Sequence, residues 1–338
     1  MIRCPRLLKF LTLAAVTSGL LAAMPGYDLF IAAKVNRDYV VGSKIVTLNG
    51  VFKRIGDGEW KHLGENDTFT TAVQFDPRDR NVIYTTSNSG LWRSFDGGVK
   101  WRLCNDWTMT EARDVAVDPN APDHVYVALP DGVAVSTDRA ETLVRKENGL
   151  PPRGKYTQVL TIDRTQAGRV FAGCEQGLFL TENGADSWRC ALPTTDMVDD
   201  VQQSPHDPQH WVAVTQSAGA WASHDNGLTW AKLPGVPDEH ALYNVTFDIT
   251  DPSRLAISSW TYGVYTSEDG GATWTERNAG LPDPHRAWRV GVGPDGTLYV
   301  SIADKMIYAS ADFGRTWRAD SLEGSSVNQF LLVPHQGR

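Results

Sequence analysis

The protein has 338 residues, of which 41% are hydrophobic and 21% charged, a composition typical of a globular protein with enough apolar residues for a core. The formal net charge is −8 at pH 7, and because no cluster of Lys and Arg marks a basic face, we expect no nucleic-acid partner. No zinc-type Cys/His spacing, phosphate-binding loop or nucleotide fingerprint is present, so we expect neither a metal nor a cofactor.

The first 23 residues predict an export signal. Arg3, Arg6 and Lys9 precede an uncharged, mostly apolar run at 11–24, which is shorter than the roughly 20 residues of a membrane-spanning helix. We therefore expect an exported protein, periplasmic or extracellular, either released from this segment or held by it, with no stable membrane span beyond it. Residues 24–42 are expected to form a linker or an extra edge strand.

From residue 43 onward the chain repeats an eight-residue stretch, which we call a box. Three copies share Ser, Asp, Gly, Thr and Trp at the same positions: SHDNGLTW (223–230), SEDGGATW (267–274) and SADFGRTW (310–317). Partial copies are SFDGGVKW (94–101), STDRAETL (136–143) and TENGADSW (181–188). Together with KRIGDGEW (53–60), their last positions follow one another at intervals of 41 to 45 residues. A fixed period of this length indicates a repeat architecture.

Each repeat predicts four antiparallel strands. In residues 242–274 the β-type runs YNVTFDI, LAISSW and GVYTS are separated by turn signals, and the box leads into a fourth run. Four such strands make one blade of a β-propeller. We therefore predict an all-β fold, a seven-bladed β-propeller over 43–338. Its ring would be closed by pairing of the C-terminal strand at 327–338 with the first blade.

We interpret the boxes as structural. The Asp can accept hydrogen bonds from backbone N–H groups of its turn, the Gly supplies a positive φ, and the Trp fills the gap between blades. A catalytic role for every box Asp is disfavoured, because one reaction needs one site. The predicted structural residues are Ser94, Asp96, Gly98, Trp101, Asp138, Asn183, Trp188, Ser223, Asp225, Gly227, Trp230, Ser267, Asp269, Gly271, Trp274, Ser310, Asp312, Gly314 and Trp317.

The pattern S-x-D-x-G-x-T-W resembles the Asp-box, or bacterial neuraminidase repeat. The surrounding sequence looks most like the photosystem II assembly-factor, sortilin-type and xyloglucanase-type propellers. Sialidases with this repeat carry an F/Y-R-I-P arginine motif, whereas FKRIG (52–56) lacks the Pro and directly precedes a box turn. The xyloglucanase type implies two propellers with catalytic Asp residues between them, and the sortilin type implies ten blades. The resemblance therefore favours the single-propeller assembly-factor group, which is mostly non-catalytic.

The loops on the face opposite the boxes are rich in aromatic and charged residues. Aromatic faces stack on sugars and Arg binds carboxylates, so we expect a protein or glycan partner there. The alternative is that these aromatic residues wedge the loops apart and the charges are simply solvated. The ligand-binding candidates are Trp107, Arg113, Tyr156, Tyr243, Trp260, Tyr262, Trp288 and Arg289.

These observations favour an exported, non-catalytic binding or assembly scaffold. The alternative is a glycoside hydrolase that acts on an extracellular polysaccharide or glycan at the channel mouth. No catalytic residue is assigned under the first interpretation. Under the second, the candidates are Glu175, Asp199 and Asp200, provided that two carboxyl groups lie roughly 5–9.5 Å apart.

Overall fold

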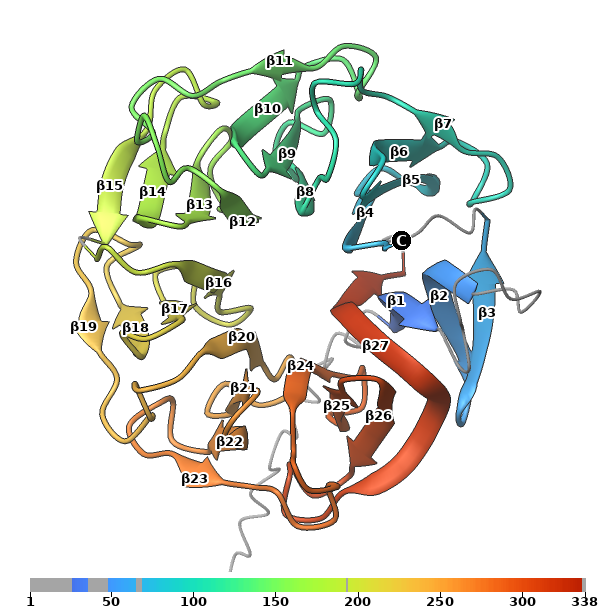
Figure 1. The fold of residues 1–338 in the computed structure, drawn as a ribbon, viewed down its shortest axis with the longest axis vertical. Helices are drawn as coiled ribbons and strands as arrows, with labels where there is room; N and C mark the ends of the chain where they lie inside the picture. Colours follow the sequence, from blue (N-terminus) through green and yellow to red (C-terminus); the bar gives the residue numbers. More distant parts are fainter. Residues whose placement is uncertain (1–25, 36–47, 65–68, 193, 336–338) are drawn as a thin grey trace, which may run out of the picture.

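A computed structural model describes residues 26–35, 48–64, 69–192 and 194–335. All 27 elements in these ranges are β-strands, and the sheets that they form stand around one common axis (Figure 1). Within the same ranges, the structure contains no apolar helix long enough to cross a membrane. The export signal expected at 1–23 lies outside the described residues and stays a prediction.

Five of the sheets contain four antiparallel strands each, with the first strand nearest the axis and the fourth at the rim (Figure 1). Three of them comprise β4 (Ala72–Asp76), β5 (Asp79–Ser87), β6 (Gly90–Ser94) and β7 (Arg102–Leu103); β8 (Asp114–Val117), β9 (Val125–Leu129), β10 (Gly132–Ser136) and β11 (Val144–Arg145); and β12 (Thr157–Ile162), β13 (Val170–Cys174), β14 (Gly177–Thr181) and β15 (Arg189–Leu192). The other two comprise β16 (Val198–Gln203), β17 (Trp211–Thr215), β18 (Ala220–Ser223) and β19 (Ala231–Lys232); and β20 (Leu242–Phe247), β21 (Leu255–Ser259), β22 (Gly263–Ser267) and β23 (Thr275–Glu276). The predicted all-β fold of repeated four-stranded antiparallel sheets is thus confirmed, and it is consistent with a β-propeller.

The sixth sheet has seven strands and joins the two ends of the chain. Its order is β24-β25-β26-β27-β1-β2-β3. The strands are β24 (Ala287–Val292), β25 (Leu298–Ile302), β26 (Lys305–Ser310), β27 (Arg318–Pro334), β1 (Tyr27–Val35), β2 (Leu48–Gly56) and β3 (Glu59–Leu63). The first part of β27 pairs with β26, and its later part pairs with β1 from Ser325 to Pro334.

The position of β1 differs from the expectation for residues 24–42. Tyr27–Val35 pairs with β27 on one side and with β2 on the other, so it is an interior strand and neither a linker nor an edge. The C-terminal strand β27 pairs directly with β1. The segment 48–63 then adds β2 and β3 on the other side of β1. The sequence YDLFIAAKV is apolar enough for this position, and five of its nine residues are buried.

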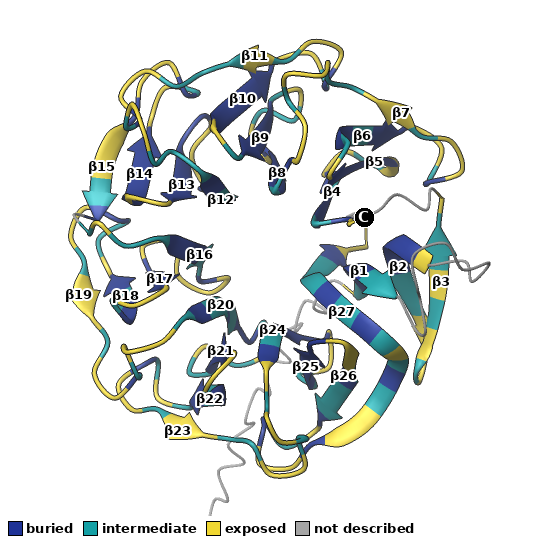
Figure 2. Cartoon of the chain, in the orientation of Figure 1, coloured by how far each residue is buried: buried dark blue, intermediate teal, exposed yellow. Residues whose placement is uncertain are grey.

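The core lies between neighbouring sheets. One cluster, for example, packs Val133 and Val135 of β10 against Leu160 of β12 in the next sheet. The inner three strands of each sheet are largely buried, whereas the rim strands are mostly exposed (Figure 2). The whole ring therefore depends on contacts between sheets, and each sheet presents its innermost strand to the axis. Cys104, Cys174 and Cys190, whose pairing an odd number left open, are all free thiols.

The boxes form turns between the third and fourth strands. In the turn after β22, Asp269 Oδ1 accepts hydrogen bonds from the Ser267 hydroxyl at 2.8 Å and from the Thr273 backbone N–H at 2.8 Å. Ser267 Oγ in turn accepts one from the Gly271 N–H at 2.8 Å, and Gly271 has φ +95°. These contacts close the turn within itself. Equivalent Ser/Thr to Asp/Asn bonds occur at Ser94–Asp96, Ser136–Asp138, Thr181–Asn183, Ser223–Asp225 and Ser310–Asp312.

Candidate functional site

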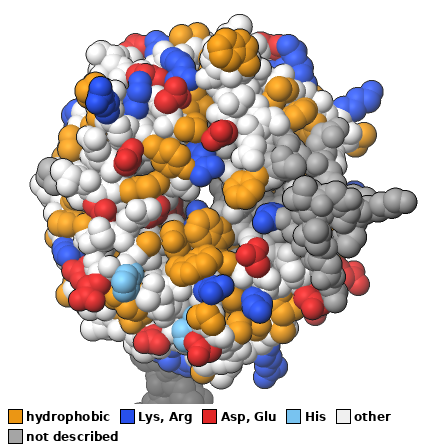
Figure 3. All heavy atoms as spheres, in the orientation of Figure 1, with side chains coloured by type: hydrophobic (Ala, Val, Ile, Leu, Met, Phe, Trp, Pro, Cys, Tyr) orange, Lys and Arg blue, Asp and Glu red, His pale blue; other side chains and the backbone are white. Residues whose placement is uncertain are grey.

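The inner strands enclose a cavity of about 1460 Å³ on the axis of the ring. Residues of β4, β8, β12, β16, β20, β24 and β27 all contribute to its lining. Figure 3 shows a hollow at the centre of the visible face, with hydrophobic side chains gathered beside it. The cavity is therefore the place where side chains from every sheet can meet one ligand.

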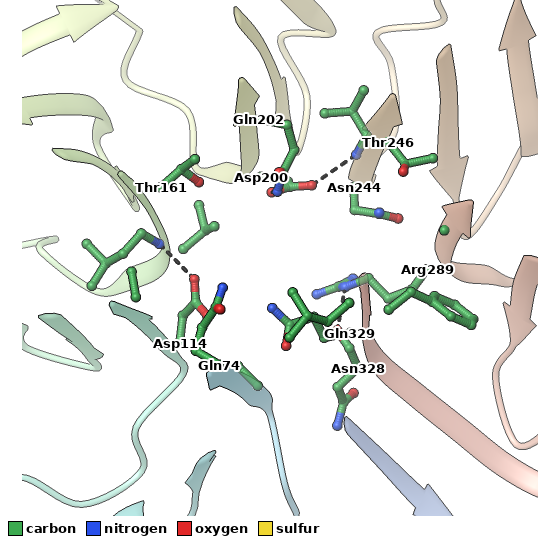
Figure 4. A pocket seen from close by; sticks show the side chains of 18 of the residues that line it. Gln74, Asp114, Thr161, Asp200, Gln202, Asn244, Thr246, Arg289, Asn328 and Gln329 are labelled. Carbon is green, nitrogen blue, oxygen red and sulfur yellow. Dashed lines mark hydrogen bonds between the residues drawn. The ribbon is translucent and has the colours of Figure 1, made fainter. Parts of the chain in front are cut away.

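Polar side chains tie inner strands to one another around the cavity (Figure 4). In each tie a side chain on one inner strand bonds to the backbone of the next inner strand, which satisfies a backbone group and fixes the spacing of the strands. The ties are Asp114 Oδ2 to Leu160 N at 2.8 Å, Asp200 Oδ2 to Val245 N at 3.0 Å, Asn244 Oδ1 to Val290 N at 2.8 Å, Arg289 Nε to Asn328 O at 3.0 Å, and Gln329 Oε1 to Val73 N at 2.7 Å.

β-Bulges place a second set of side chains at the cavity. The pairing register shifts by one residue near the start of β12, β16, β20 and β24. A bulge leaves one residue unpaired and turns its side chain away from the regular alternation. The extra residues are Gln158, Asp199, Tyr243 and Trp288, and all four line the cavity.

Four buried aspartates line the cavity: Asp76, Asp114, Asp199 and Asp200. Asp76 pairs with Arg78 at 2.8 Å, and of the other three only Asp199 has a free carboxyl group. Both oxygens of Asp114 accept backbone hydrogen bonds, and those of Asp200 accept from Gln202 and from the Val245 backbone. Asp199 is 7% exposed, and its Oδ2 is buried without a hydrogen-bond partner among the described residues. Burial raises the pKa of Asp199 to about 7, that of Asp114 to about 7 and that of Asp200 to about 6.

Arg289 reaches into the cavity from β24 (Figure 4). Its Nη1 donates to the Trp288 carbonyl at 2.9 Å, and its guanidinium lies 4.4 Å from the centre of the Trp288 ring. Burial lowers the pKa of Arg289, and the nearby Asp200 and Asp199 carboxylates act in the opposite direction. No ion pair joins this guanidinium to a carboxylate in the described part of the chain, so its remaining donors face the cavity.

An aromatic cluster adjoins Arg289. The Tyr243 ring lies 4.5 Å from the Trp288 ring and 6.4 Å from the Trp260 ring, and the two indoles are 6.2 Å apart at 90°. Trp260 is 38% exposed, and the Arg286 guanidinium lies 5.6 Å from its ring. Part of this aromatic surface is therefore open to a ligand. The free carboxyl group of Asp199 lies near Tyr243 of this cluster.

The structure brings most of the expected site residues together. Arg113, Tyr156, Glu175, Asp199, Asp200, Tyr243, Trp288 and Arg289 line the cavity. Three others do not: Trp107 is 86% exposed, Trp260 contacts the lining only through its neighbours' rings, and Tyr262 packs on His240 with the ring centres 5.4 Å apart. Four further lining residues carry no sequence signal beyond their alternation with core residues: Gln74, Thr161, Gln202 and Thr246. Among the described residues, no three Asp, Glu, His or Cys side chains are grouped to hold a metal ion.

Known proteins with similar sequences are xyloglucanases. No protein-family model matches the chain. A xyloglucanase of Paenibacillus sp is 21% identical over 317 residues, which cover 80% of this chain and 27% of that protein. Three more curated relatives are also named as xyloglucanases, and the chain spans about a quarter to a third of the length of these curated relatives.

Solved structures with a similar fold are propeller-type proteins. The GH74 xyloglucanase from Xanthomonas campestris gives a TM-score of 0.62 at 18% identity, over 74% of this chain and 45% of that one. YCF48 from Cyanidioschyzon merolae gives a TM-score of 0.58 at 17% identity, over 76% and 86% of the two chains. At such identities the likeness shows the fold alone.

The expectation of a non-catalytic scaffold is wrong. The curated relatives are named as xyloglucanases, which are glycoside hydrolases, and these names support the alternative interpretation. The error came from treating a single propeller as evidence against catalysis. A fold of this kind does not by itself distinguish a hydrolase from a scaffold, because function depends on the residues of a site.

Proposed function

We propose that this chain is the propeller of a glycoside hydrolase that acts on an extracellular glycan at the central cavity. The observation that carries the proposal is the buried, unpartnered carboxyl group of Asp199, which lies in the cavity beside an aromatic cluster. The names of the curated relatives add a substrate class, xyloglucan, whose glucan backbone is uncharged.

In this proposal Asp199 is the general acid. A carboxyl group must be protonated to donate to the glycosidic oxygen. Burial raises the pKa of Asp199 to about 7, so the group keeps its proton at mildly acidic pH and is about half protonated at pH 7. No other described group is hydrogen-bonded to Asp199 Oδ2, so no protein partner competes with a ligand for the carboxyl proton. Asp114 and Asp200 hold the strands on either side and act as positioning residues.

Glu175 is the proposed second carboxylate. It lies in the turn between β13 and β14, one sheet before Asp199, and it lines the same cavity. Unlike Asp199 it is exposed, and no described side chain binds its oxygens. Two carboxyl groups in contrasting environments are what glycoside hydrolysis requires, one to protonate the leaving group and one to attack or to activate water.

Tyr243, Trp288 and Trp260 form the proposed sugar-binding surface. Their rings offer flat apolar faces at the cavity mouth, and pyranose rings stack on such faces through their C–H groups. The Trp288 indole also donates a hydrogen bond to Asn328 Oδ1 at 3.0 Å, which fixes its orientation. A ligand stacked there lies next to Asp199, since Tyr243 and Asp199 occupy equivalent bulges on neighbouring strands.

We also infer that the ring is a closed seven-bladed propeller of the Asp-box superfamily. The seven-stranded sheet is then two blades that share β27, whose first part ends one blade and whose last part begins the next. This gives seven inner strands, which agrees with the seven that line the cavity. Export remains part of the proposal, supported by the composition of residues 1–23 and by the glycan substrate named for the relatives.

Hydrolysis of xyloglucan by the purified chain, followed as new reducing ends, tests the proposal. We expect Asp199→Asn to lower the rate by about 10²–10⁴-fold, the usual contribution of a general acid. Asp196→Asn is the matched control, because Asp196 lines the same cavity but its oxygens already accept from Ser217. Equal rates for Asp199→Asn and the wild type, or no cleavage of any soluble glucan, would refute the proposal.

A further inference from the structure

Two half-buried arginines at the cavity lack an anionic partner of the kind that Arg54, Arg93 and Arg169 have. Arg54 pairs with Asp320 at 2.9 Å, Arg93 with Glu141 at 2.6 Å and Arg169 with Asp163 at 3.0 Å. Arg289 and Arg113 form no ion pair with any carboxylate in the described ranges. In addition, Arg113 Nε is buried without a hydrogen-bond partner, and its guanidinium lies 5.2 Å from the centre of the Tyr156 ring.

The aspartates at the cavity do not neutralise Arg289 directly. The carboxylates of Asp114 and Asp200 already hold backbone and amide donors, and neither these two nor Asp199 is in ion-pair contact with the guanidinium. Burial raises the pKa values of all three, so at mildly acidic pH they are mostly neutral and the positive charge of Arg289 stays uncompensated. Arg289 is half-buried and unpaired, so an anion from outside gains a charge-assisted hydrogen bond by binding beside it.

A carboxylate is the anion that suits this environment. Guanidinium groups bind carboxylates through two parallel N–H···O bonds, and Arg289 has free donors on the cavity side, because only Nε and Nη1 are engaged among the described residues. Directly beside it, Trp288 and Tyr243 provide flat rings for a pyranose. Stacking surface and guanidinium thus come from neighbouring positions, which favours a sugar over a peptide as the carrier of the carboxylate.

We propose that the cavity selects a glycan that carries carboxylate groups, a uronic-acid-bearing oligosaccharide, with one carboxylate bound by Arg289 and the sugar ring stacked on Trp288 and Tyr243. Arg113, which precedes β8 and lines the same cavity, adds positive potential there. This inference rests on the proposed function, since it places the ligand at the same site. It departs from the uncharged glucan of the relatives, and the arginine pair is the reason for the difference.

Binding to a matched pair of oligosaccharides tests the inference on the intact wild-type chain. Cellotetraose and β-1,4-tetraglucuronate have the same linkage and ring geometry and differ only in the oxidation of C6 to a carboxylate. By titration calorimetry at pH 5.5 we expect the tetraglucuronate to bind at least about tenfold more tightly, and the difference to shrink with added salt. Equal binding, or tighter binding of cellotetraose, overturns the inference.

Variants then locate the carboxylate site. Arg289→Met should abolish the preference for tetraglucuronate, whereas Arg286→Met, which removes an arginine that lies on Trp260 outside the cavity lining, should keep it. A preference that survives Arg289→Met overturns the assignment. Because Arg289 also ties β24 to β27, the thermal melting of each variant is measured first, and Arg289→Lys serves as the variant that keeps the charge.

The outcomes separate this inference from the proposed function. Tight, Arg289-dependent binding of tetraglucuronate without any glycan cleavage supports the inference and refutes the hydrolase. Cleavage of neutral xyloglucan that depends on Asp199, with no preference for the carboxylate, supports the hydrolase and refutes the inference. A tripeptide with a free C-terminal carboxylate is titrated in parallel with its amide, and carboxylate-dependent binding as tight as that of the tetraglucuronate would show a peptide site instead.

Discussion

Asp200 Oδ2 accepts a hydrogen bond of 3.0 Å from the backbone N–H of Val245, on the inner strand of the next sheet. The preceding residue, Asp199, occupies a bulge and makes no such contact. Two adjacent aspartates of the same strand therefore have different roles, one in holding the ring together and one at the cavity. This separation recurs at Tyr243 and Asn244, where the bulge residue again lines the cavity and its successor ties two strands.

The first prediction concerns the stability of variants at these two positions. Asp200→Ala leaves the Val245 N–H buried without a partner, so we expect the free energy of unfolding to fall by about 1–3 kcal/mol. Asp199→Asn removes a buried carboxyl group that has no partner, and we expect little loss. Urea denaturation at pH 7 compares the two variants. Equal losses for both would contradict the division of roles.

The second prediction concerns stability as a function of pH. The folded-state pKa of Asp199 is raised from 3.8 to about 7, so between these values the folded protein binds more protons than the unfolded chain. The contribution of Asp199 to stability therefore falls as the pH rises from about 4 to 7. Asp114 and Asp200, raised to about 7 and about 6, act in the same direction. Urea midpoints between pH 5 and 8 should fall with pH in the wild type, and fall less steeply in Asp199→Asn.

The third prediction concerns the pH dependence of hydrolysis. If Asp199 is the general acid, the rate falls as the pH rises through about 7, because the carboxyl group loses the proton that it must donate. The charged and titratable groups that face it are Asp200 on its own strand, Tyr156 just before β12, Tyr243 on β20, Arg289 on β24 and Asp196 in the preceding loop. Arg289→Met should shift the fall of the hydrolysis rate on the alkaline side to higher pH, since the guanidinium favours the ionised form of Asp199. A fall at an unchanged pH would show that another group controls the rate.

Features that depend on residues close together in the sequence could be predicted, whereas features that depend on residues far apart in the sequence could not. The period of the box Trp residues and the alternation in runs such as LAISSW predicted the strands and their antiparallel order, because both signals are local. The place of Tyr27–Val35 was not predicted. Its partner is the far end of the chain, from Ser325 to Pro334, and nothing in the short, mostly apolar sequence YDLFIAAKV specifies that pairing.

The site was predictable in outline but not in its roles. Loop position and residue type selected Asp199, Tyr243, Trp288 and Arg289, all of which line the cavity. The sequence could not distinguish Asp199 from Asp200, since a bulge of one residue has no reliable local signature. Only the backbone of the next sheet, through the Val245 N–H, shows which of the two carboxyl groups is already engaged.

The fourth prediction concerns the aromatic cluster. Trp288→Ala removes the ring on which both Tyr243 and Arg289 pack, and we expect the affinity for a glycan ligand to fall by about tenfold, corresponding to about 1–1.5 kcal/mol of stacking. Trp107→Ala is the control, because Trp107 is 86% exposed and is absent from the cavity lining. Affinity electrophoresis in a gel containing xyloglucan measures both. A larger effect at Trp107 would move the binding surface away from the cavity.

The fifth prediction concerns the sheet that joins the chain ends. Arg54 on β2 binds both oxygens of Asp320 on β27 at 2.9 Å, and its guanidinium lies 5.0 Å from the Tyr299 ring of β25. This bidentate pair is largely buried and couples β2 to the first part of β27, which pairs with β26. Breaking a pair of this kind leaves one charge uncompensated, and we expect Arg54→Met to cost about 1–3 kcal/mol.

A double-mutant cycle with Asp320→Asn isolates that coupling, because the second substitution should cost little once Arg54 is gone. Arg318→Met is the matched control, since Arg318 is an exposed arginine on β27, the strand that also carries Asp320. If Arg54→Met and Arg318→Met have the same urea midpoint, the Arg54–Asp320 pair does not stabilise the contact between β2 and β27. In that case the hydrogen bonds between β1 and β27, together with contacts such as Trp60 Nε1 to Ser321 Oγ at 2.9 Å, connect the two ends of the chain.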